Sequence, residues 1–283
     1  MNTFLIDELL RGFVREDLEH GDITTEAIFS GSERAAAVMR AREPLIAAGM
    51  ETVAARVFRL LDEQVHVEPL AADGQQVAAG ETLLKISGPV PSLLRGERVA
   101  LNLVQRLCGI AALTRKYVEA VQGCKAAITD TRKTTPGLRL LEKYAVRCGG
   151  GRNHRFSLSD GVLIKDNHIA ACGSISEAVQ RARAAVPHTI AIEVETETLA
   201  QVEECLGCKV QIIMLDNMDT MAMRQAVKLI DGRAVVEASG GVSLQTVRAI
   251  AETGVDIISV GALTHSAPAC DIGLDWAVPA AHQ

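Results

Sequence analysis

The second half of the chain alternates short β-branched runs with helix-like stretches, and this rhythm most limits the possible folds. Strands that alternate with helices in this way predict a parallel sheet built from βα units. Six such units in about 140 residues suit either a (β/α) barrel or a doubly wound sheet. The runs lie at 126–129, 162–164, 190–194, 211–215, 234–237 and 257–260, with helix-like stretches at 175–186, 218–230 and 244–252.

Polar or glycine-rich segments follow all six runs, which helps to choose between these two folds. A (β/α) barrel builds its site from the carboxyl ends of all its strands. A doubly wound sheet concentrates such residues near one switch point. The distribution therefore favours a barrel with fewer than eight strands. The segments are 130–133, 165–168, the pair Glu193 and Glu195, Asp216-Asn217, Ser239-Gly240-Gly241 and Gly261.

The first 110 residues or so have a different pattern and predict a separate domain. Residues 3–18 have apolar side chains at helical spacing, 65–87 are strand-like, and 93–121 are mostly helical. The DGxxVxxG segment that begins at Asp73 is similar to half of a biotinyl or lipoyl domain. No lysine sits at a hairpin tip for attachment, so a β-rich scaffold is the better interpretation.

Composition and charge exclude several classes of function. The formal net charge is −6, and five Phe, two Tyr and one Trp are the only aromatic residues. A nucleic-acid binder needs a basic face or a stacking platform, so we expect no nucleic-acid partner. No uncharged apolar stretch approaches the roughly 18–20 residues of a membrane helix, and the first residues lack the pattern of a secretory signal.

The seven cysteines are odd in number and scattered, which predicts reduced thiols in the cytoplasm. Cys205 and Cys208 have CxxC spacing. A zinc site would need a second such pair, and a redox site would open a helix after a strand, whereas this pair closes a helix-like stretch. We interpret both cysteines as structural thiols.

Familiar catalytic motifs are missing from the sequence, but a basic group stands out. There is no GxxxxGK[ST], no GxGxxG after a strand, no GxSxG and no HExxH. Arginine offers a forked donor that matches carboxylate or phosphate, and lysine adds compact charge. A cluster of cations at strand ends in an acidic chain predicts an anion-binding site. Its members are Arg132, Lys133, Arg155 and Lys165, with Arg98 and His154 as further candidates.

Two carboxylates and two glycine-containing segments extend this candidate site. Glu195 and Asp216 end successive strands, and together they could hold Mg²⁺ or bind sugar hydroxyls. Ser239-Gly240-Gly241 and Val260-Gly261-Ala262 follow the last two strands, the usual phosphate position in barrel enzymes. Glycine permits close backbone approach, and we expect the following helix to add a positive N-terminus.

Several long motifs resemble the quinolinate phosphoribosyltransferase family, also called nicotinate-nucleotide pyrophosphorylase (carboxylating). The resemblance covers essentially the whole chain, and the blocks between 130 and 168 are the most specific. The matching motifs are DTRKTTPGLR at 130–139, KYAV at 143–146, GGGRNHR at 149–155, LIKDNH at 163–168, EVE at 193–195, LDN at 215–217, SGG at 239–241, VGALTHS at 260–266, and, earlier, ED at 16–17, GDITT at 21–25 and GER at 96–98.

The resemblance implies an architecture and an assembly. It implies an N-terminal α/β sandwich domain over residues 1–109, joined by the C-terminal tail 266–283, and an incomplete (β/α) barrel catalytic domain over 110–265. It also implies a homodimer, or an assembly of dimers, in which the N-terminal domain caps the barrel of the partner. Arg98 would then reach into the neighbouring subunit's site.

The implied reaction joins quinolinate and phosphoribosyl pyrophosphate to give nicotinate mononucleotide, CO₂ and pyrophosphate, with Mg²⁺ as cofactor, in de novo NAD biosynthesis. Lys133, Glu195 and Asp216 would be catalytic, and Glu195 and Asp216 would hold ribose and metal, through water in one arrangement. The implied substrate-binding residues are Arg98, Thr131, Arg132, Lys133, His154, Arg155, Lys165, Glu195, Asp216, Ser239, Gly240, Gly241, Val260, Gly261 and Ala262.

Three alternatives stay open at this point. A molybdenum-associated paralogue keeps the barrel but alters the basic block, whereas both basic blocks are intact here. Nicotinate phosphoribosyltransferase handles one carboxylate rather than two and needs fewer cations. A phosphometabolite-binding scaffold would have lost Lys133, Glu195 or Asp216, and all three are present.

Overall fold

A computed structural model describes residues 2–276, which fold as two compact units. Among these residues, the first unit comprises 2–113, 147–150 and 267–276, and the second comprises 114–146 and 151–266. The helix α4 (Val90–Ala120) carries the chain from one unit to the next, and the boundary expected at 109/110 lies within this helix. The return of 147–150 to the first unit was not predicted from the sequence.

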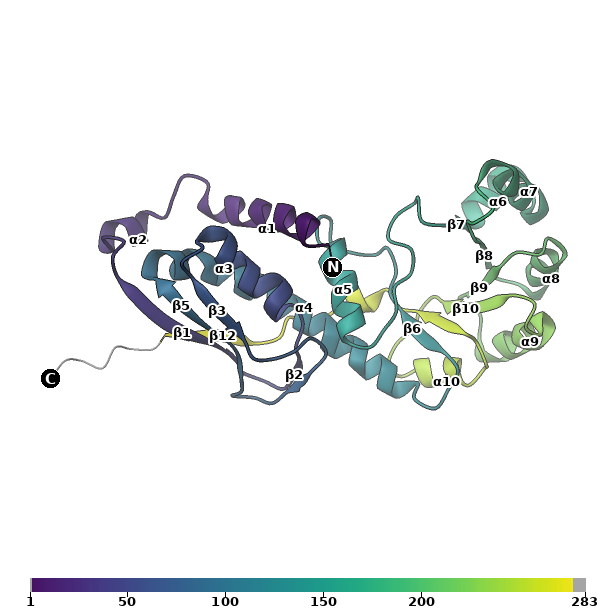
Figure 1. Cartoon of the computed structure of the whole chain (residues 1–283). Coiled ribbons are helices and arrows are strands. Elements are labelled where there is room, and N and C mark those ends of the chain that lie inside the picture. Colours follow the sequence, from purple (N-terminus) through teal and green to yellow (C-terminus); the bar gives the residue numbers. More distant parts are fainter. Residues whose placement is uncertain (1, 277–283) are drawn as a thin grey trace. The chain divides into compact units, whose positions relative to one another are not determined.

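The first unit contains a four-stranded antiparallel sheet in the order β12-β1-β5-β3, and a separate β2-β4 pair. Helices α1 and α3 lie side by side (Figure 1). The strands are β1 (Arg34–Ala41), β2 (Leu45–Ile46), β3 (His66–Pro69), β4 (Gln76–Val77), β5 (Thr82–Pro89) and β12 (Ile272–Trp276), and the helical elements are α1 (Thr3–Leu18), α2 (Ile23–Ile28), η1 (Met50–Ala55) and α3 (Arg56–Leu61).

The C-terminal segment completes the sheet of this unit. Residues 37–41 of β1 pair with β12 in antiparallel register. Gly109 of α4 permits the approach, because a Cβ there would lie 1.9 Å from the carbonyl oxygen of Pro268. The remainder of the expected tail, 277–283, lies outside the described residues.

The second unit is built on six parallel strands in the order β6-β11-β10-β9-β8-β7. Within residues 2–276 this row leaves β6 and β7 as its two edges, so the barrel is incomplete, as the sequence predicted. The strands are β6 (Ala127–Thr129), β7 (Val162–Ile164), β8 (Ile192–Thr196), β9 (Ile212–Asp216), β10 (Val235–Ser239) and β11 (Ile257–Ser259).

Helices α7, α8 and α9 cover the outer face of this sheet (Figure 1). Their buried residues include Val179, Val202 and Met223, and the strands carry buried residues such as Val194 and Ile213. The helices are α5 (Arg139–Cys148), α6 (Asp166–Cys172), α7 (Ile175–Ala185), α8 (Leu199–Gly207), α9 (Thr220–Ile230), α10 (Val247–Ala251) and α11 (Ala262–His265). Across residues 2–276, every helix is too short or too polar to cross a membrane.

Candidate active site

A cleft of about 560 Å³ opens at the carboxyl ends of the six strands in the second unit. Eleven residues that the sequence predicts for the site line it, so segments far apart in the chain meet there. They are Thr131, Arg132, Lys133, His154, Arg155, Lys165, Glu195, Asp216, Ser239, Gly240 and Gly241.

Strand alternation explains which side chains enter the barrel. Because side chains two apart in a strand share a face, Glu193 and Glu195 of β8 point the same way, as do Glu237 and Ser239 of β10. Val194, between the two glutamates of β8, is fully buried on the opposite face. The inner face thus carries two tiers of polar groups. The upper tier, at the cleft, includes Glu195 and Ser239, and the lower tier, deeper in the barrel, includes Glu193 and Glu237.

Lys165 and Glu195 form an ion pair across neighbouring strand ends. The Nζ atom of Lys165 lies 2.6 Å from Oε2 of Glu195, and the lysine side chain is about half exposed. The backbone N–H of Lys165 donates to Nδ1 of His168 at 3.0 Å, which fixes the start of α6. The pair thus brings together a residue predicted to bind the pyridine dicarboxylate and one predicted to bind ribose or metal.

Arg132 and Arg155 give the cleft two mutually repelling cations. Burial, with the nearby charge of Arg132, lowers the pKa of Arg155. The Nη1 atom of Arg155 donates to the carbonyl of Gly161 at 2.8 Å. Among the described residues, the buried Nε atom of Arg132 has no hydrogen-bond partner. An anion between these guanidinium groups would relieve the repulsion and accept from the unused donor.

The loops after β9 and β10 are locked together by a close backbone approach. Asn217 donates its backbone N–H to the carbonyl of Ser239 at 2.9 Å. A Cβ on Gly240, whose φ is +90°, would lie 2.2 Å from Oδ1 of Asn217. Gly240 is therefore required by both conformation and space. Asp216 accepts from Nδ2 of Asn217 at 2.8 Å, so the carboxylate is tied to the same junction.

The helices expected after these glycine segments are present, but both are short, and only the one after Gly261 begins at once. The helix after Gly241 begins only at Val247 and spans 5 residues, and α11 after Gly261 spans 4. Residues 244–246 form a turn just before this helix. A helix dipole therefore contributes little, and any phosphate contact would come from loop backbone N–H groups.

Gly261 supports the site without lining the cleft. A Cβ at this position would lie 3.0 Å from Cδ of Lys133, so the glycine leaves room for the lysine side chain. Thr264 Oγ1 donates to the carbonyl of Lys133 at 2.8 Å and holds the backbone of the same residue. Of the other predicted members of this segment, Val260 is 1% exposed, and neither it nor Ala262 lines the cleft.

A fully buried ion pair ties the two basic loops to each other. Lys143 of α5 donates to Asp130, and both side chains have no exposed surface. Lys143 Nζ also donates to the carbonyl of His154 at 2.9 Å, and the N–H of His154 donates to Oδ1 of Asp130 at 2.9 Å. Asn153 Nδ2 donates to Oδ2 of Asp130 at 2.5 Å. Burial raises the pKa of Asp130 and lowers that of Lys143.

His154, Glu193 and Glu237 form a buried cluster beneath the cleft. His154 Nε2 lies 3.3 Å from Oε2 of Glu193 and 3.5 Å from Oε1 of Glu237. Burial and the charge of Glu193 raise the pKa of Glu237 to about 7. Burial lowers the pKa of His154, but the two carboxylates more than offset this effect. The ligand-type atoms of the three residues lie within 4.8 Å of one another, a spacing that matches a metal site.

The lining also includes five residues that were not predicted as site members. Glu237 could have been predicted from the alternation of β10, because Glu237 lies two residues before Ser239 and therefore shares its face of the strand. Asn217 was visible as part of a polar strand end. Arg98, predicted to serve a partner subunit, is an exposed residue of α4 in the first unit. The five are Leu163, Met214, Asn217, Glu237 and Ser259.

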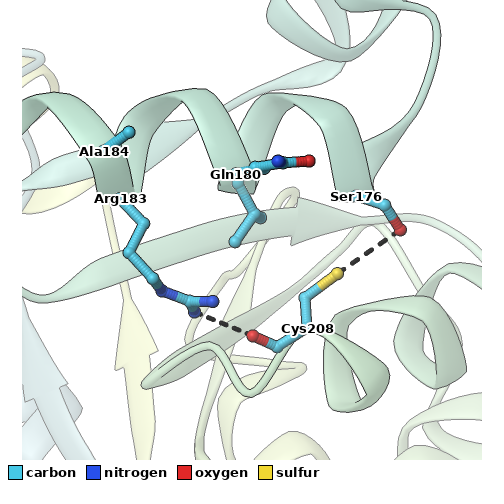
Figure 2. Close-up of a pocket in the computed structure, with 6 residues that line it drawn as sticks. Ser176, Gln180, Arg183, Ala184 and Cys208 are labelled. Atoms are coloured by element: carbon cyan, nitrogen blue, oxygen red, sulfur yellow. Dashed lines mark hydrogen bonds between the residues drawn. The ribbon is translucent and has the colours of Figure 1, made fainter.

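A second hollow, of about 410 Å³, lies on the outside of the barrel (Figure 2). Here Cys208 Sγ donates to Ser176 Oγ at 3.4 Å, and Arg183 donates to the carbonyl of Cys208 at 2.7 Å. Its partner in the CxxC segment, Cys205, is fully buried, and burial raises the pKa of that thiol to about 12. An inert thiol of this kind fits the structural interpretation.

Comparison with protein families matches both parts of the chain to one enzyme family. Residues 22–108 match the model for the quinolinate phosphoribosyl transferase N-terminal domain. Residues 110–275 match the model for the C-terminal domain of the same family. The two matches meet close to the boundary that the change of sequence pattern indicated.

Individual relatives agree over nearly the full length. A probable nicotinate-nucleotide pyrophosphorylase [carboxylating] of Bacillus subtilis is 47% identical over 275 residues, covering 97% of this chain and 94% of the relative. NadC from Streptococcus pyogenes has a crystal structure with a TM-score of 0.93 and 44% identity, covering 98% and 99% of the two chains. Human nicotinic acid phosphoribosyltransferase, 13% identical with a TM-score of 0.62, shares the fold alone.

Proposed function

The chain belongs to the quinolinate phosphoribosyltransferase family, and we propose from this premise that the cleft is where it acts. The enzyme transfers the phosphoribosyl group of phosphoribosyl pyrophosphate to the ring nitrogen of quinolinate. Loss of CO₂ then gives nicotinate mononucleotide, and pyrophosphate is the other product. This is a pentosyl transfer in de novo NAD biosynthesis.

The observation that carries this proposal is the concentration of positive charge in the cleft. Quinolinate has two carboxylates, the charge of Arg132 acts on Arg155 in the same cleft, and the buried Nε of Arg132 has no hydrogen-bond partner among the described residues. Bidentate pairing with a carboxylate satisfies such a donor. Lys165, about half exposed beside Glu195, supplies a further cation. His154 presents its ring at the base of the same cleft.

The ribosyl donor occupies the opposite part of the cleft. Glu195 and Asp216 bind the ribose hydroxyls, and the loop of Ser239, Gly240 and Gly241 binds the phosphate through its backbone N–H groups. Lys133 lies beside Gly261 and reaches the reacting centre between the two substrates. Orientation and charge placement carry the reaction, because the ring nitrogen is itself the nucleophile and no covalent enzyme intermediate is needed.

A divalent metal fits the donor set at Glu195 and Asp216. These carboxylates end the neighbouring strands β8 and β9, and carboxylate oxygens are the ligands that Mg²⁺ prefers. When bound, Mg²⁺ supplies charge that stabilises the leaving pyrophosphate. Glu195 already accepts from Lys165, so contact through water suits this residue better than displacement of the lysine.

The assembly is a homodimer, or an assembly of dimers, in which Arg98 completes the site of the partner. Arg98 is exposed on α4 and is free of any cleft role within the second unit. Mixing Arg98→Ala with Lys165→Ala subunits should restore roughly a quarter of native activity, because half of the dimers are hybrids with one intact site each. No recovery despite verified subunit exchange would contradict the shared site.

The enzyme works in the cytoplasm. Every cysteine of the chain is free, which agrees with a reducing compartment.

The reaction is tested with purified protein, phosphoribosyl pyrophosphate and Mg²⁺, with quinolinate or nicotinate as acceptor. We expect mononucleotide and an equal amount of CO₂ from quinolinate and little product from nicotinate. A protein that makes no mononucleotide from quinolinate would refute the function. One that uses nicotinate equally well would refute the role of the second carboxylate.

A matched pair of variants assigns the activity to the cleft. Asp216→Asn should lower kcat/KM at least about 100-fold, because it removes a charge next to the reacting ribose. Asp219→Asn makes the same exchange three residues later, at the N-cap of α9, and asparagine caps a helix as well as aspartate does. Equal activity of the two variants would place the reaction elsewhere.

A further inference from the structure

The cleft and a further cavity of the second unit share three lining residues, His154, Arg155 and Glu237. This cavity measures about 280 Å³, and Glu193, Ile212 and Ile257 are among its lining residues. Glu237 is 2% exposed and Glu193 is 4% exposed. Two acidic side chains are therefore held beside each other at the floor of the substrate cleft, away from bulk water.

The hydrogen bonds of His154 fix which ring nitrogen carries the proton. The backbone N–H of Arg155 donates to Nδ1 of His154 at 2.8 Å, so Nδ1 is an acceptor. Nε2 then carries the hydrogen, which points at Glu193 and Glu237. A flipped ring would place carbon atoms against both sets of partners, so the observed orientation is the one that satisfies them.

This tautomer argues against a metal at the cluster. A metal at Nε2 would need the lone pair of that nitrogen, and the proton would move to Nδ1. Nδ1–H would then face the N–H of Arg155, and the 2.8 Å contact would become donor against donor. The same contact opposes a second proton on the ring, even though the two carboxylates attract one.

An extra proton in this cluster therefore resides on a carboxyl group. Two ionised carboxylates side by side in a buried site repel each other, and the loss of hydration adds to that cost. Oε1 of Glu237 has no hydrogen-bond partner among the described residues. The charged groups nearest Glu237 are Glu193 from β8 and His154 from the loop before β7, and Arg155 of that loop lines both cavities with it. Ser259 of β11 offers a hydroxyl. On β9, Ile212 and Met214 are apolar, and Asp216 lies farther along the strand at the cleft.

The reaction needs a proton at this place. When the ribosylated ring loses CO₂, the electron pair of the broken C–C bond stays on the ring carbon next to the cationic nitrogen. That carbon must gain a proton to become nicotinate mononucleotide. We propose that Glu237 is the acid that supplies this proton, and that His154, with its Nε2–H held by Glu193, keeps the proton on Glu237. This inference rests on the proposed function.

The step balances as a single proton transfer. The O–H bond of Glu237 breaks as the C–H bond of the ring forms, and the carbanion electron pair becomes that bond. Glu237 is left as a carboxylate and takes a proton from solvent before the next turnover. The pKa near 7 that burial and Glu193 give to Glu237 suits a group that must both give and regain a proton at neutral pH.

The direct test is Glu237→Gln, which keeps the shape and neutral charge of the protonated acid but has no acidic proton. We expect kcat with quinolinate to fall about 100-fold or more, the size of a general-acid contribution, with KM for both substrates changed less than about threefold. The native kcat should decline above about pH 7, and the variant should lose that decline. Glu252→Gln, at the exposed C-cap of α10, is the matched control and should behave as the native protein.

A second variant keeps the inference testable if Glu237→Gln does not fold. Glu193→Gln removes the neighbouring charge, so the decline in native kcat should move about one pH unit toward acid. The role of Glu237 would be overturned if the native protein converts quinolinate and the folded Glu237→Gln variant keeps a kcat within threefold of the native value. A Glu193→Gln profile identical to that of the native protein would overturn it as well. If the native protein makes no product, the proposed function itself fails, which is a separate result.

Discussion

The buried pair of Lys143 and Asp130 offers the sharpest test of how the basic loops are held. Lys143→Met keeps most of the side-chain volume but removes the ammonium group. Asp130 would then keep its bonds from Asn153 and the N–H of His154 but lose its countercharge. Breaking a fully buried ion pair from one side costs about 3–5 kcal/mol, because a charge is left without compensation.

The same contacts predict how the loss of stability in Lys143→Met depends on pH. Lys143 is the main group that lowers the pKa of Asp130 against the effect of burial, so its loss raises that pKa further. A carboxyl whose pKa is raised in the folded state favours folding at low pH, and this benefit is lost as pH rises through the raised value. Lys143→Met should therefore be more destabilised at about pH 8 than at about pH 5.

Lys143→Met should also impair substrate binding, for a reason separate from its loss of stability. Lys143 and Asp130 hold both the carbonyl and the N–H of His154, so the loop of His154 and Arg155 loses its anchor in the variant. We expect KM for quinolinate to rise about tenfold or more. Adding Asp130→Asn removes the stranded charge, so the double variant should regain at least about 2 kcal/mol while its KM stays high.

Urea unfolding at fixed protein concentration measures the stability of the native protein, both single variants and the double variant. Lys125→Met is the control, because Lys125 also pairs with an aspartate, Asp256, but is 70% exposed and should cost at most about 1 kcal/mol. A loss below about 1 kcal/mol in Lys143→Met, or a double variant no more stable than the single, would refute the reasoning.

Two further predictions concern the phosphate loop and the buried acid. Gly240→Ala should lower kcat/KM for phosphoribosyl pyrophosphate at least about tenfold, because the added Cβ would clash with Asn217. Gly241→Ala is the control, because no atom lies within 4 Å of its added Cβ, and its kcat/KM should fall less in the same assay. Equal losses would contradict the close-approach argument. Glu237→Gln should be more stable than the native protein by about 3 kcal/mol in thermal or urea unfolding at about pH 8.5, and no more stable at about pH 4. The reason is that the raised pKa of Glu237 penalises the folded native state progressively between about pH 4.5 and about pH 7, and the full penalty is present above that range. A gain that does not change with pH would contradict this.

Much of the site could be predicted because parallel strands impose a simple rule. Residues at the carboxyl end of each strand meet at one edge, so Lys165, Glu195 and Asp216 were foreseeable as neighbours once six strands were recognised. Ser239 and its glycines followed for the same reason. The long helix and the β-rich segment of the first unit were likewise visible from apolar spacing and turn residues.

Contacts that depend on loop geometry could not be predicted in this way. The approach of Gly240 to Asn217 depends on a positive φ at both residues, and the sequence shows only a glycine and an asparagine. The same holds for Lys143. From the sequence it is expected to be a solvated lysine on a helix surface, but in the structure its side chain has no exposed surface. The helix α10 was predicted, but its start was placed too early, because residues 244–246 have helical composition and form turns.

The distribution of charge in the second unit differs from what the net charge of the sequence suggests. A net charge of −6 describes a surface rich in carboxylates, yet the cleft needs cations for its substrates and acids for its chemistry. The barrel resolves this by depth. Arg132 and Lys133 lie at the strand ends, where an anion can reach them, while Glu193 and Glu237 lie one tier lower and are nearly inaccessible. Because burial raises the cost of two carboxylates, we expect the lower tier to hold a proton rather than a second negative charge. The upper tier therefore stays electropositive although four acidic residues stand within the barrel, and exchanging the tiers would remove both properties.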